Sequence, residues 1–150
     1  MSEMQESGGL LDGILAVTHP KLYAAGRQLM KHLSLGNDLV RAVVSEWPSV
    51  FHAVHVIVNR ETLYHRDNNG RPGWYDLLLS LGTYGEEAVL SLRTFGVSLP
   101  YDTGSVVTLC SRIIAHGVPA VPPDRICLAW LMKDNILSYY DIPAPEWRTL

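Results

Sequence analysis

The sequence predicts a mainly β protein of the α+β class, in which helices precede an antiparallel sheet that closes into a small barrel or sandwich. Three observations predict this class. Apolar residues recur at helical spacing before residue 48. After it, strand-length segments rich in β-branched and aromatic residues alternate with turn sequences. No spacer between these segments is long enough for the helix that a parallel crossover requires.

The first helical signal follows an N-terminus that looks unstructured. Residues 1–9 are polar and end in two glycines, which predicts a flexible segment. Residues 10–48 are expected to be helical. Within them, apolar residues at helical spacing follow Pro20, which suits a first helical turn, and Gly36 suits a C-terminal cap. These apolar residues are Leu22, Ala25, Leu29 and Leu33.

A second, shorter helix is expected directly afterwards. Asn37 or Asp38 would cap its N-terminus, and Pro48 would end it. From residue 49 the character of the sequence changes, and we expect the sheet over residues 49–136. Its strand-like segments are SVFHAVHVIVN, WYDLLLSL, AVLSLRTF, SVVTLCSRIIA and RICLAWLM. Turn sequences separate them at 67–73, 82–87, 100–104 and 116–124. Residues 137–150 contain two prolines and are expected to form a tail packed on the surface.

Composition narrows the class further. The chain has 150 residues, of which 47% are hydrophobic and 18% charged, which fits one globular domain and excludes a disordered, collagen-like or coiled-coil chain. Cys110 and Cys127 are too few for a disulfide framework and are expected to be small buried apolar residues. We expect an intracellular protein without membrane spans, since no apolar run approaches about 18 residues and no secretory signal is recognisable. The net charge of −3 means that any nucleic-acid binding must depend on local charge.

The segment around His65 carries the first candidate for chemistry. On an extended strand His65 and Asp67 would point to one face and Arg66 to the other. An imidazole and a carboxylate on one face form two-thirds of the two-histidine, one-carboxylate triad that binds ferrous iron in oxygenases. Taken alone this motif is weak, because a chain with six histidines has about even odds of one such pair by chance.

Two later residues make the pattern more specific. His116 ends an apolar segment and could supply the second histidine, although a structural histidine at a strand end is the simpler interpretation. Arg125 opens the apolar segment RICLAWLM. A guanidinium there suits a carboxylate, or alternatively a salt bridge with Asp124 or Asp134.

These residues carry a resemblance to a known family. The run IVNRETLYHRDNNGRPGWYDLLLSLG, then AHGV, then DRICLAWLMKDN resembles the TET/JBP family of iron- and 2-oxoglutarate-dependent dioxygenases, most closely its fungal, transposon-associated branch. The resemblance implies a double-stranded β-helix, a distorted jelly roll, that oxidises the methyl group of 5-methylcytosine or thymine. It implies that His65, Asp67 and His116 bind Fe(II), and that Arg125 holds the distal carboxylate of 2-oxoglutarate.

Further residues are candidate contacts of the co-substrate or the substrate. Asn59 shares the strand parity of His65 and could bind the co-substrate, or be a turn residue. Other candidates could contact the substrate or belong to the core. They are Tyr64 and Trp74 beside the metal loop, and Ala129, Leu131 and Lys133 on the face of Arg125. Arg60, Arg66 and Arg71 could contact phosphates or form a solvated charge cluster.

The resemblance further implies methylated DNA as the substrate, with its base flipped out of the duplex, in a nuclear enzyme. We expect this enzyme to be a monomer. Two alternatives stay open. One is a 2-oxoglutarate oxygenase acting on RNA bases, free nucleobases or protein side chains. The other is a degenerate barrel without turnover, which Leu131 favours, because relatives tend to place an aromatic residue or a histidine in this region to stack on the base.

Overall fold

The structure is a computed structural model that describes residues 4–68, 70–84, 88–121 and 124–146. The chain divides into two compact units. We call Ala53–Leu131 the sheet unit, and Met1–His52 together with Met132–Leu150 the helical unit. Each unit is described by itself.

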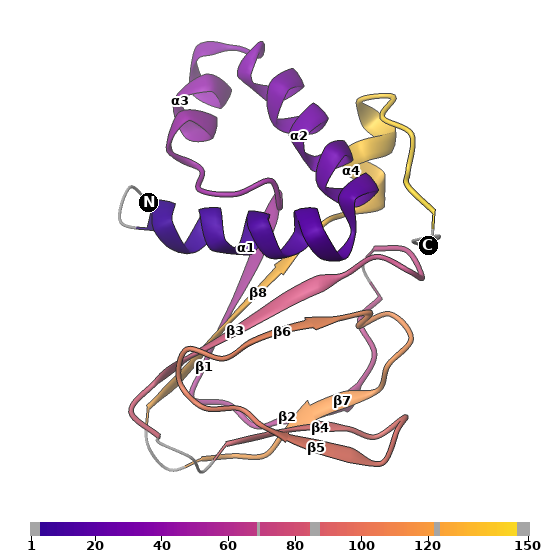
Figure 1. The fold of residues 1–150 in the computed structure, drawn as a ribbon. Helices are drawn as coiled ribbons and strands as arrows, with labels where there is room; N and C mark the ends of the chain where they lie inside the picture. The colour runs from indigo at the N-terminus through magenta and orange to yellow at the C-terminus, as the bar shows by residue number, and fades with distance from the viewer. Residues whose placement is uncertain (1–3, 69, 85–87, 122–123, 147–150) are drawn as a thin grey trace. The chain divides into compact units, whose positions relative to one another are not determined.

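The helical unit contains helices from both ends of the chain (Figure 1). They are α1 (Gln5–Thr18), α2 (Pro20–Ser34), α3 (Asp38–Glu46) and α4 (Asp134–Tyr139). The predicted start of α2 is confirmed, since Pro20 lies in its first turn. So is the cap of α3, where Val40 N donates to Asn37 Oδ1 at 3.0 Å. The helix ends at Glu46, just before Pro48.

The prediction of a flexible segment over residues 1–9 is wrong from Gln5 onwards, where α1 begins; residues 1–3 lie outside the described part. Glycines disfavour a helix, but here tertiary contacts outweigh this propensity. A Cβ on Gly8 would lie 2.0 Å from Pro48 O, so only glycine permits this approach. Asp12 accepts hydrogen bonds from Ser49 Oγ at 2.6 Å and Val50 N at 2.9 Å, which fixes the segment after α3 against α1.

The sheet unit is a sandwich of two four-stranded antiparallel sheets (Figure 1). The first has the order β1-β8-β3-β6 and the second β2-β7-β4-β5. The strands are β1 (Ala53–Val58), β2 (Thr62–His65), β3 (Asp76–Gly82), β4 (Val89–Leu92), β5 (Val97–Pro100), β6 (Val106–Leu109), β7 (His116–Val118) and β8 (Arg125–Leu131). The predicted class is confirmed: a mainly β, jelly-roll-like core preceded by helices.

Two strand predictions were wrong in detail. The segment SVVTLCSRIIA is not one strand, because β6 ends at Leu109 and a turn follows. Ile113 N and Ile114 N both donate to Cys110 O, at 3.1 and 3.0 Å, which closes this turn. His116 therefore begins β7 rather than ending a strand, inside a stretch expected to be a turn. An apolar run of that length does not show where the chain reverses.

The predicted boundaries also shift. The sheet was expected over 49–136, whereas the sheet unit comprises Ala53–Leu131, and residues 49–52 and 132–136 belong to the helical unit. The predicted tail at 137–150 is partly helical, since it contains the second half of α4, residues 137–139. Leu137 and Ile142 are buried, so this segment contributes to the helical unit's core. Residues 147–150 lie outside the described part.

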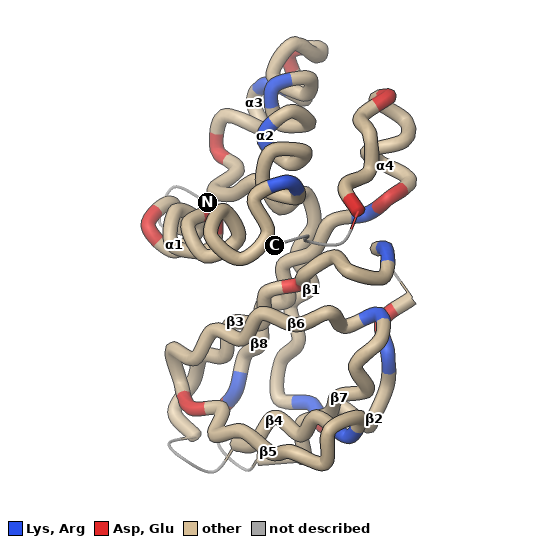
Figure 2. The backbone as a smooth tube through the Cα atoms, turned by 45° about the vertical axis from the view of Figure 1, so that its right-hand side comes forward, with Lys and Arg blue, Asp and Glu red and all other residues tan. Residues whose placement is uncertain are grey.

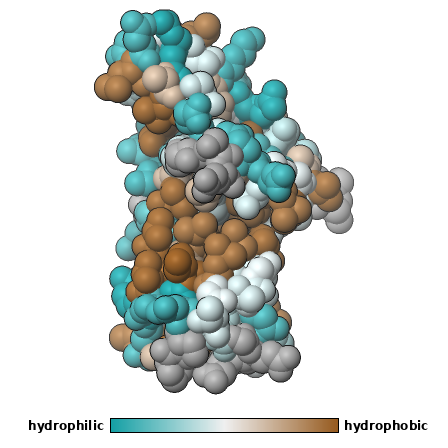
Figure 3. Space-filling view, turned by 90° about the vertical axis from the view of Figure 1, so that its left-hand side faces the viewer, coloured by the Kyte–Doolittle hydropathy of each residue, from teal (hydrophilic) through white to brown (hydrophobic). Residues whose placement is uncertain are grey.

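The core of the sheet unit lies between its two sheets. Leu78, Leu90, Tyr101, Leu109 and Val118 are buried there together. The opposite face of the first sheet is also apolar, and four of its large side chains remain exposed: Val56, Val58, Leu81 and Ile126. Figure 3 shows one face of the molecule on which hydrophobic residues reach the surface. Among the described residues, no helix is both long and apolar enough to span a membrane.

Candidate metal centre and co-substrate pocket

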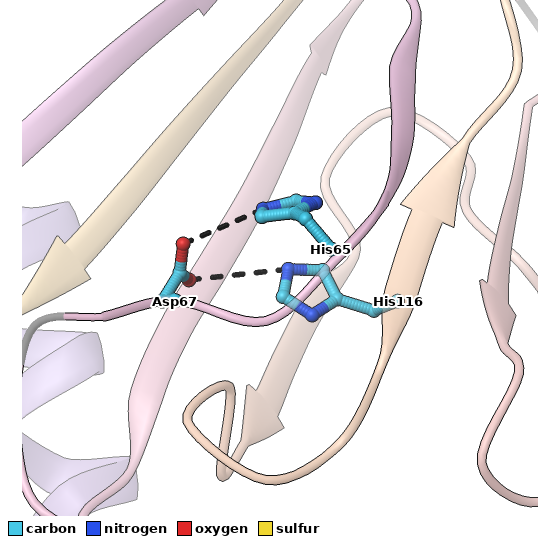
Figure 4. A group of neighbouring side chains, drawn as sticks. All are labelled: His65, Asp67 and His116. Atoms are coloured by element: carbon cyan, nitrogen blue, oxygen red, sulfur yellow. Dashed lines mark ion pairs between the residues drawn. The ribbon is translucent and has the colours of Figure 1, made fainter.

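Strand pairing brings two distant histidines together. β2 and β7 are antiparallel, and His65 lies directly opposite His116 in their register. The two imidazole rings have centroids 4.4 Å apart (Figure 4). Residues opposite each other in a ladder point to the same face, so both rings project between the two sheets.

Each ring is fixed by a backbone carbonyl two residues earlier. His65 Nδ1 lies 2.9 Å from Leu63 O, and His116 Nδ1 lies 3.0 Å from Ile114 O. A carbonyl only accepts, so Nδ1 carries the proton in both rings and Nε2 is left with a free lone pair. A backbone carbonyl that holds the second ring nitrogen in this way is typical of histidines that bind metals.

The carboxylate of Asp67 faces both free nitrogens (Figure 4). Its Oδ1 lies 3.4 Å from His65 Nε2, and its Oδ2 lies 4.0 Å from His116 Nε2. The predicted parity is confirmed by Arg66, whose Nε turns away to donate to Ile113 O at 2.9 Å. Asp67 itself follows the end of β2, so its backbone is held by another contact.

That contact leads to a buried acid. Asp67 N donates to Ser111 O at 3.1 Å, and Ser111 Oγ donates to Asp76 Oδ2. Burial raises the pKa of Asp76 to about 7, the Ser111 hydroxyl lowers it and the charge of Asp67 raises it. Asp76 at the start of β3 is thus linked through Ser111 to the backbone of Asp67.

The donor set fits a ferrous ion. One ligand atom from each of His65, Asp67 and His116 lies within 4.8 Å of the others. Burial lowers the pKa of His116, which favours the neutral, metal-binding imidazole. Two imidazoles and one carboxylate on one face are the ligands of non-haem Fe(II) oxygenases, and they leave positions open for other ligands.

The metal-ligand group lies in a cavity of about 480 Å³ between the two sheets. Alternate residues of β8 line this cavity: Arg125, Cys127, Ala129 and Leu131. Their shared face is therefore confirmed. Trp130, with the opposite parity, is buried but does not line the cavity. The floor thus changes from a cation at Arg125 to apolar side chains at Leu131.

Arg125 is 2% exposed, and its guanidinium has no carboxylate partner among the described residues. Its Nη2 donates to Arg60 O at 3.0 Å. Asp124, one of the two carboxylates considered as its partner, instead accepts from Asn59 Nδ2 at 2.7 Å. A buried guanidinium without a counter-ion is costly, and a carboxylate fits its remaining donors. The cavity therefore combines a site for an ion with a site for an anionic end of a small molecule.

Comparison with known proteins supports this chemistry. The family model Tet_JBP, described as the oxygenase domain of the 2OGFeDO superfamily, matches residues 1–134. The chain belongs to the Tet_JBP family. The comparison with curated proteins finds no match.

Membership of the Tet_JBP family settles the reaction class. The chain is an Fe(II)- and 2-oxoglutarate-dependent dioxygenase, and Fe(II) and 2-oxoglutarate are the cofactors of its superfamily. The fungal branch stays a prediction.

Several other residues that the sequence predicted for the site do not line the cavity. Tyr64 is exposed, with the guanidinium carbon of Arg93 5.2 Å from its ring centroid, and Trp74 is buried; neither lines the cavity. Lys133 lies beyond the end of β8, at the start of α4 in the helical unit. The alternation of side chains ends with the strand at Leu131, and the sequence does not mark this end. Asn59 is a turn residue with φ +48°, and its amide bonds the chain itself.

The sequence interpretation missed three titratable residues that line the cavity: His55, Asp76 and Tyr101. His55 lies opposite Ala129 in the β1–β8 register, so its imidazole shares the cavity face. Parity alone could have found it once β1 and β8 were paired. Tyr101 Oη lies 3.5 Å from Cys127 Sγ, and burial raises the pKa of both groups. Cys110 and Cys127 are free and buried, as expected.

Proposed function

We propose that the chain oxidises the methyl group of 5-methylcytosine, or of a related methylated base, in nucleic acid. One observation carries this proposal: the three candidate ligands face a single cavity whose floor runs from Arg125 to Leu131. Its volume of about 480 Å³ lies within the range of small-molecule sites, roughly 300–1,000 Å³. The family resemblance supplies the substrate class.

Each end of the cavity has a distinct task. His65, Asp67 and His116 would hold the ferrous ion, which when bound activates oxygen with 2-oxoglutarate as the reductant. Arg125 would bind the distal carboxylate of 2-oxoglutarate through a charge-assisted pair of hydrogen bonds. Ala129, Leu131 and Leu78 would enclose the substrate methyl at the apolar end and keep water away from it.

A base inside a duplex cannot reach this cavity. The substrate base would therefore be flipped or single-stranded. Arginines of the sheet unit lie exposed and are suited to phosphates: Arg60, Arg66, Arg71, Arg93 and Arg112. Figure 2 shows basic positions around β2 and β7, the strands that carry the two histidines. Nucleic acid is the proposed partner on this ground, and a nuclear location would follow from DNA as the substrate.

The test is nucleoside mass spectrometry. The protein is incubated with Fe(II), 2-oxoglutarate and single-stranded or duplex DNA containing 5-methylcytosine, and succinate is measured in the same tube. We expect oxidised 5-methylcytosine in wild type and none with His65→Ala. Succinate without an oxidised base would overturn the proposed substrate and leave the oxygenase. The same assay on methylated RNA and free 5-methylcytosine would then distinguish the remaining substrates.

A further inference from the structure

The ladder between β1 and β8 ends beside Arg125. Val58 and Ile126 form its last register pair, and Asn59 N then donates to Arg125 O at 2.9 Å. Asn59 is thus the first residue after β1 and the direct neighbour of the buried cation. This backbone hydrogen bond fixes the position of Arg125 at the start of β8.

The Asn59 side chain adds two hydrogen bonds, one accepted and one donated. Arg125 N donates to Asn59 Oδ1 at 2.8 Å, and Asn59 Nδ2 donates to Asp124 Oδ1 at 2.7 Å. The amide must present its oxygen to an N–H group and its nitrogen to a carboxylate, so these two partners define its orientation. The side chain bridges two consecutive residues at the start of β8.

The backbone of Asn59 contributes as well. Its φ of +48° is left-handed, a conformation that asparagine tolerates better than most residues. The chain turns there, and the next carbonyl, Arg60 O, accepts from Arg125 Nη2 at 3.0 Å. One residue therefore restrains both the backbone and the guanidinium of Arg125.

The opposite side of Arg125 is equally restricted. Arg125 pairs with Gly82 of β3, and Thr83 N donates to Asp124 O at 3.0 Å. A Cβ on Gly82 would lie 2.1 Å from Asp124 O. The segment of Asp124 and Arg125 is thus held between β3 on one side and Asn59 on the other.

We propose that Asn59 and Asp124 form a clamp that positions the Arg125 guanidinium and thereby sets the affinity for 2-oxoglutarate. Both are positioning residues, since their amide and carboxylate bind the chain rather than the co-substrate. The inference rests on the role proposed for Arg125. A guanidinium that is held in place before binding loses less side-chain freedom when the carboxylate arrives.

The test exchanges the amide and the carboxylate between positions 59 and 124. Asn59→Asp keeps an acceptor for Arg125 N but sets a carboxylate against Asp124. We expect the dissociation constant of 2-oxoglutarate to rise roughly five- to tenfold. Asp124→Asn keeps an acceptor for Asn59 Nδ2 and should stay within about twofold of wild type. The double variant Asn59→Asp/Asp124→Asn restores a donor opposite an acceptor, and its affinity should return to near wild type.

Binding is measured anaerobically by calorimetry on Fe(II)-loaded protein, so no turnover is needed. A second ligand, 2-oxobutyrate, has the same 2-oxo acid group without the distal carboxylate, and its affinity should not change in Asn59→Asp. Asn135→Asp adds the same charge at an exposed position of the helical unit and serves as the matched control. In turnover, KM for 2-oxoglutarate should rise while kcat at saturation is kept.

The outcomes separate the two proposals. If Arg125→Met leaves 2-oxoglutarate binding unchanged, the role of Arg125 fails, and the clamp's function fails with it. If Arg125→Met weakens binding but Asn59→Asp does not, only the clamp is overturned. If Asn59→Asp also weakens the binding of Fe(II) and 2-oxobutyrate and lowers the thermal midpoint, the role of Asn59 is merely structural. Failure of the double variant to recover would also contradict the clamp.

Discussion

His65 and His116 lie opposite each other in the antiparallel register of β2 and β7, with their ring centroids 4.4 Å apart. Each Nδ1 lies within hydrogen-bond distance of the carbonyl two residues earlier in its own chain segment. This repeated local geometry turns both Nε2 atoms toward Asp67. The ladder between two short strands is thus what assembles a metal site from residues far apart in sequence.

The first prediction tests the parity of this site. His65→Ala removes one of three candidate ligands and should weaken Fe(II) binding by more than the 10–100-fold typical of outer-shell changes. Arg66→Ala should leave Fe(II) affinity unchanged, because the Arg66 side chain points to Ile113 O. Competition with a chelator under anaerobic conditions measures both. Loss of iron with Arg66→Ala alone would show that the assigned face is wrong.

The second prediction concerns the buried cation. Arg125→Met keeps the length of the side chain and removes its charge. It should weaken 2-oxoglutarate binding about 100-fold, because a charge-assisted bidentate pair contributes about 3 kcal/mol. Fe(II) affinity should not change. Since the wild-type guanidinium is buried without a carboxylate among the described residues, the ligand-free variant should be at least as stable as wild type.

Calorimetry with Fe(II) and then 2-oxoglutarate separates the two affinities, and urea unfolding measures the stability. Parallel losses of iron and 2-oxoglutarate would contradict the assigned role. A large loss of stability would show that the cation has a counter-ion within the protein.

The metal ligands and Arg125 show which parts of the site can be predicted from the sequence. His65 and Asp67 are two residues apart, and the parity rule correctly puts them on one face, although β2 ends at His65 and the Ser111 carbonyl holds Asp67 in place. Arg125 and Leu131 could be assigned to one side of β8 because the strand is regular from end to end. Local periodicity is therefore sufficient wherever a functional pair shares one strand.

Other features depend on contacts between distant segments, which no local pattern records. Gly8 and Gly9 argue against a helix, yet α1 includes them, since Gly8 packs against Pro48. His55 becomes a cavity residue only through its register with Ala129. Parity made Asn59 a candidate contact of the co-substrate, with a turn residue as the alternative, and its left-handed turn after β1 directs the amide to Asp124 and Arg125.

The third prediction tests the link between Asp76 and the metal site. Ser111→Ala removes the hydroxyl that donates to Asp76 Oδ2 but keeps the Ser111 carbonyl that accepts from Asp67 N. We expect the free energy of unfolding to fall by about 1–2 kcal/mol, because a buried carboxyl group loses its donor. Fe(II) affinity should fall only severalfold, since all three ligands remain. Asp102→Asn, an acid in the same unit outside the cavity, is the control.

Unfolding in urea and chelator competition measure these two effects. A loss of iron as large as that of His65→Ala would mean that Ser111 or Asp76 takes part in binding the ion directly. No change in either quantity would show that the hydrogen bond to Asp76 contributes nothing to the site.

The last prediction concerns the pH dependence of the helical unit. Lys133 N donates to His52 Nε2 at 2.6 Å, so Nδ1 carries the proton of the neutral ring, and no described residue accepts from it. Burial lowers the pKa of His52 from 6.5 to about 4. The unfolded chain therefore binds more protons than the folded chain between these two values. The stabilisation is fully present above pH 6.5 and is lost as the pH falls toward 4, by about 3 kcal/mol.

His52→Gln keeps an acceptor for Lys133 N without a titrating group, so this part of the acid destabilisation should disappear. Urea unfolding followed by the helical circular dichroism signal at several pH values measures it, with His32→Gln, an exposed histidine on α2, as the control that keeps the wild-type slope. An unchanged slope in His52→Gln would show that another group causes the acid sensitivity.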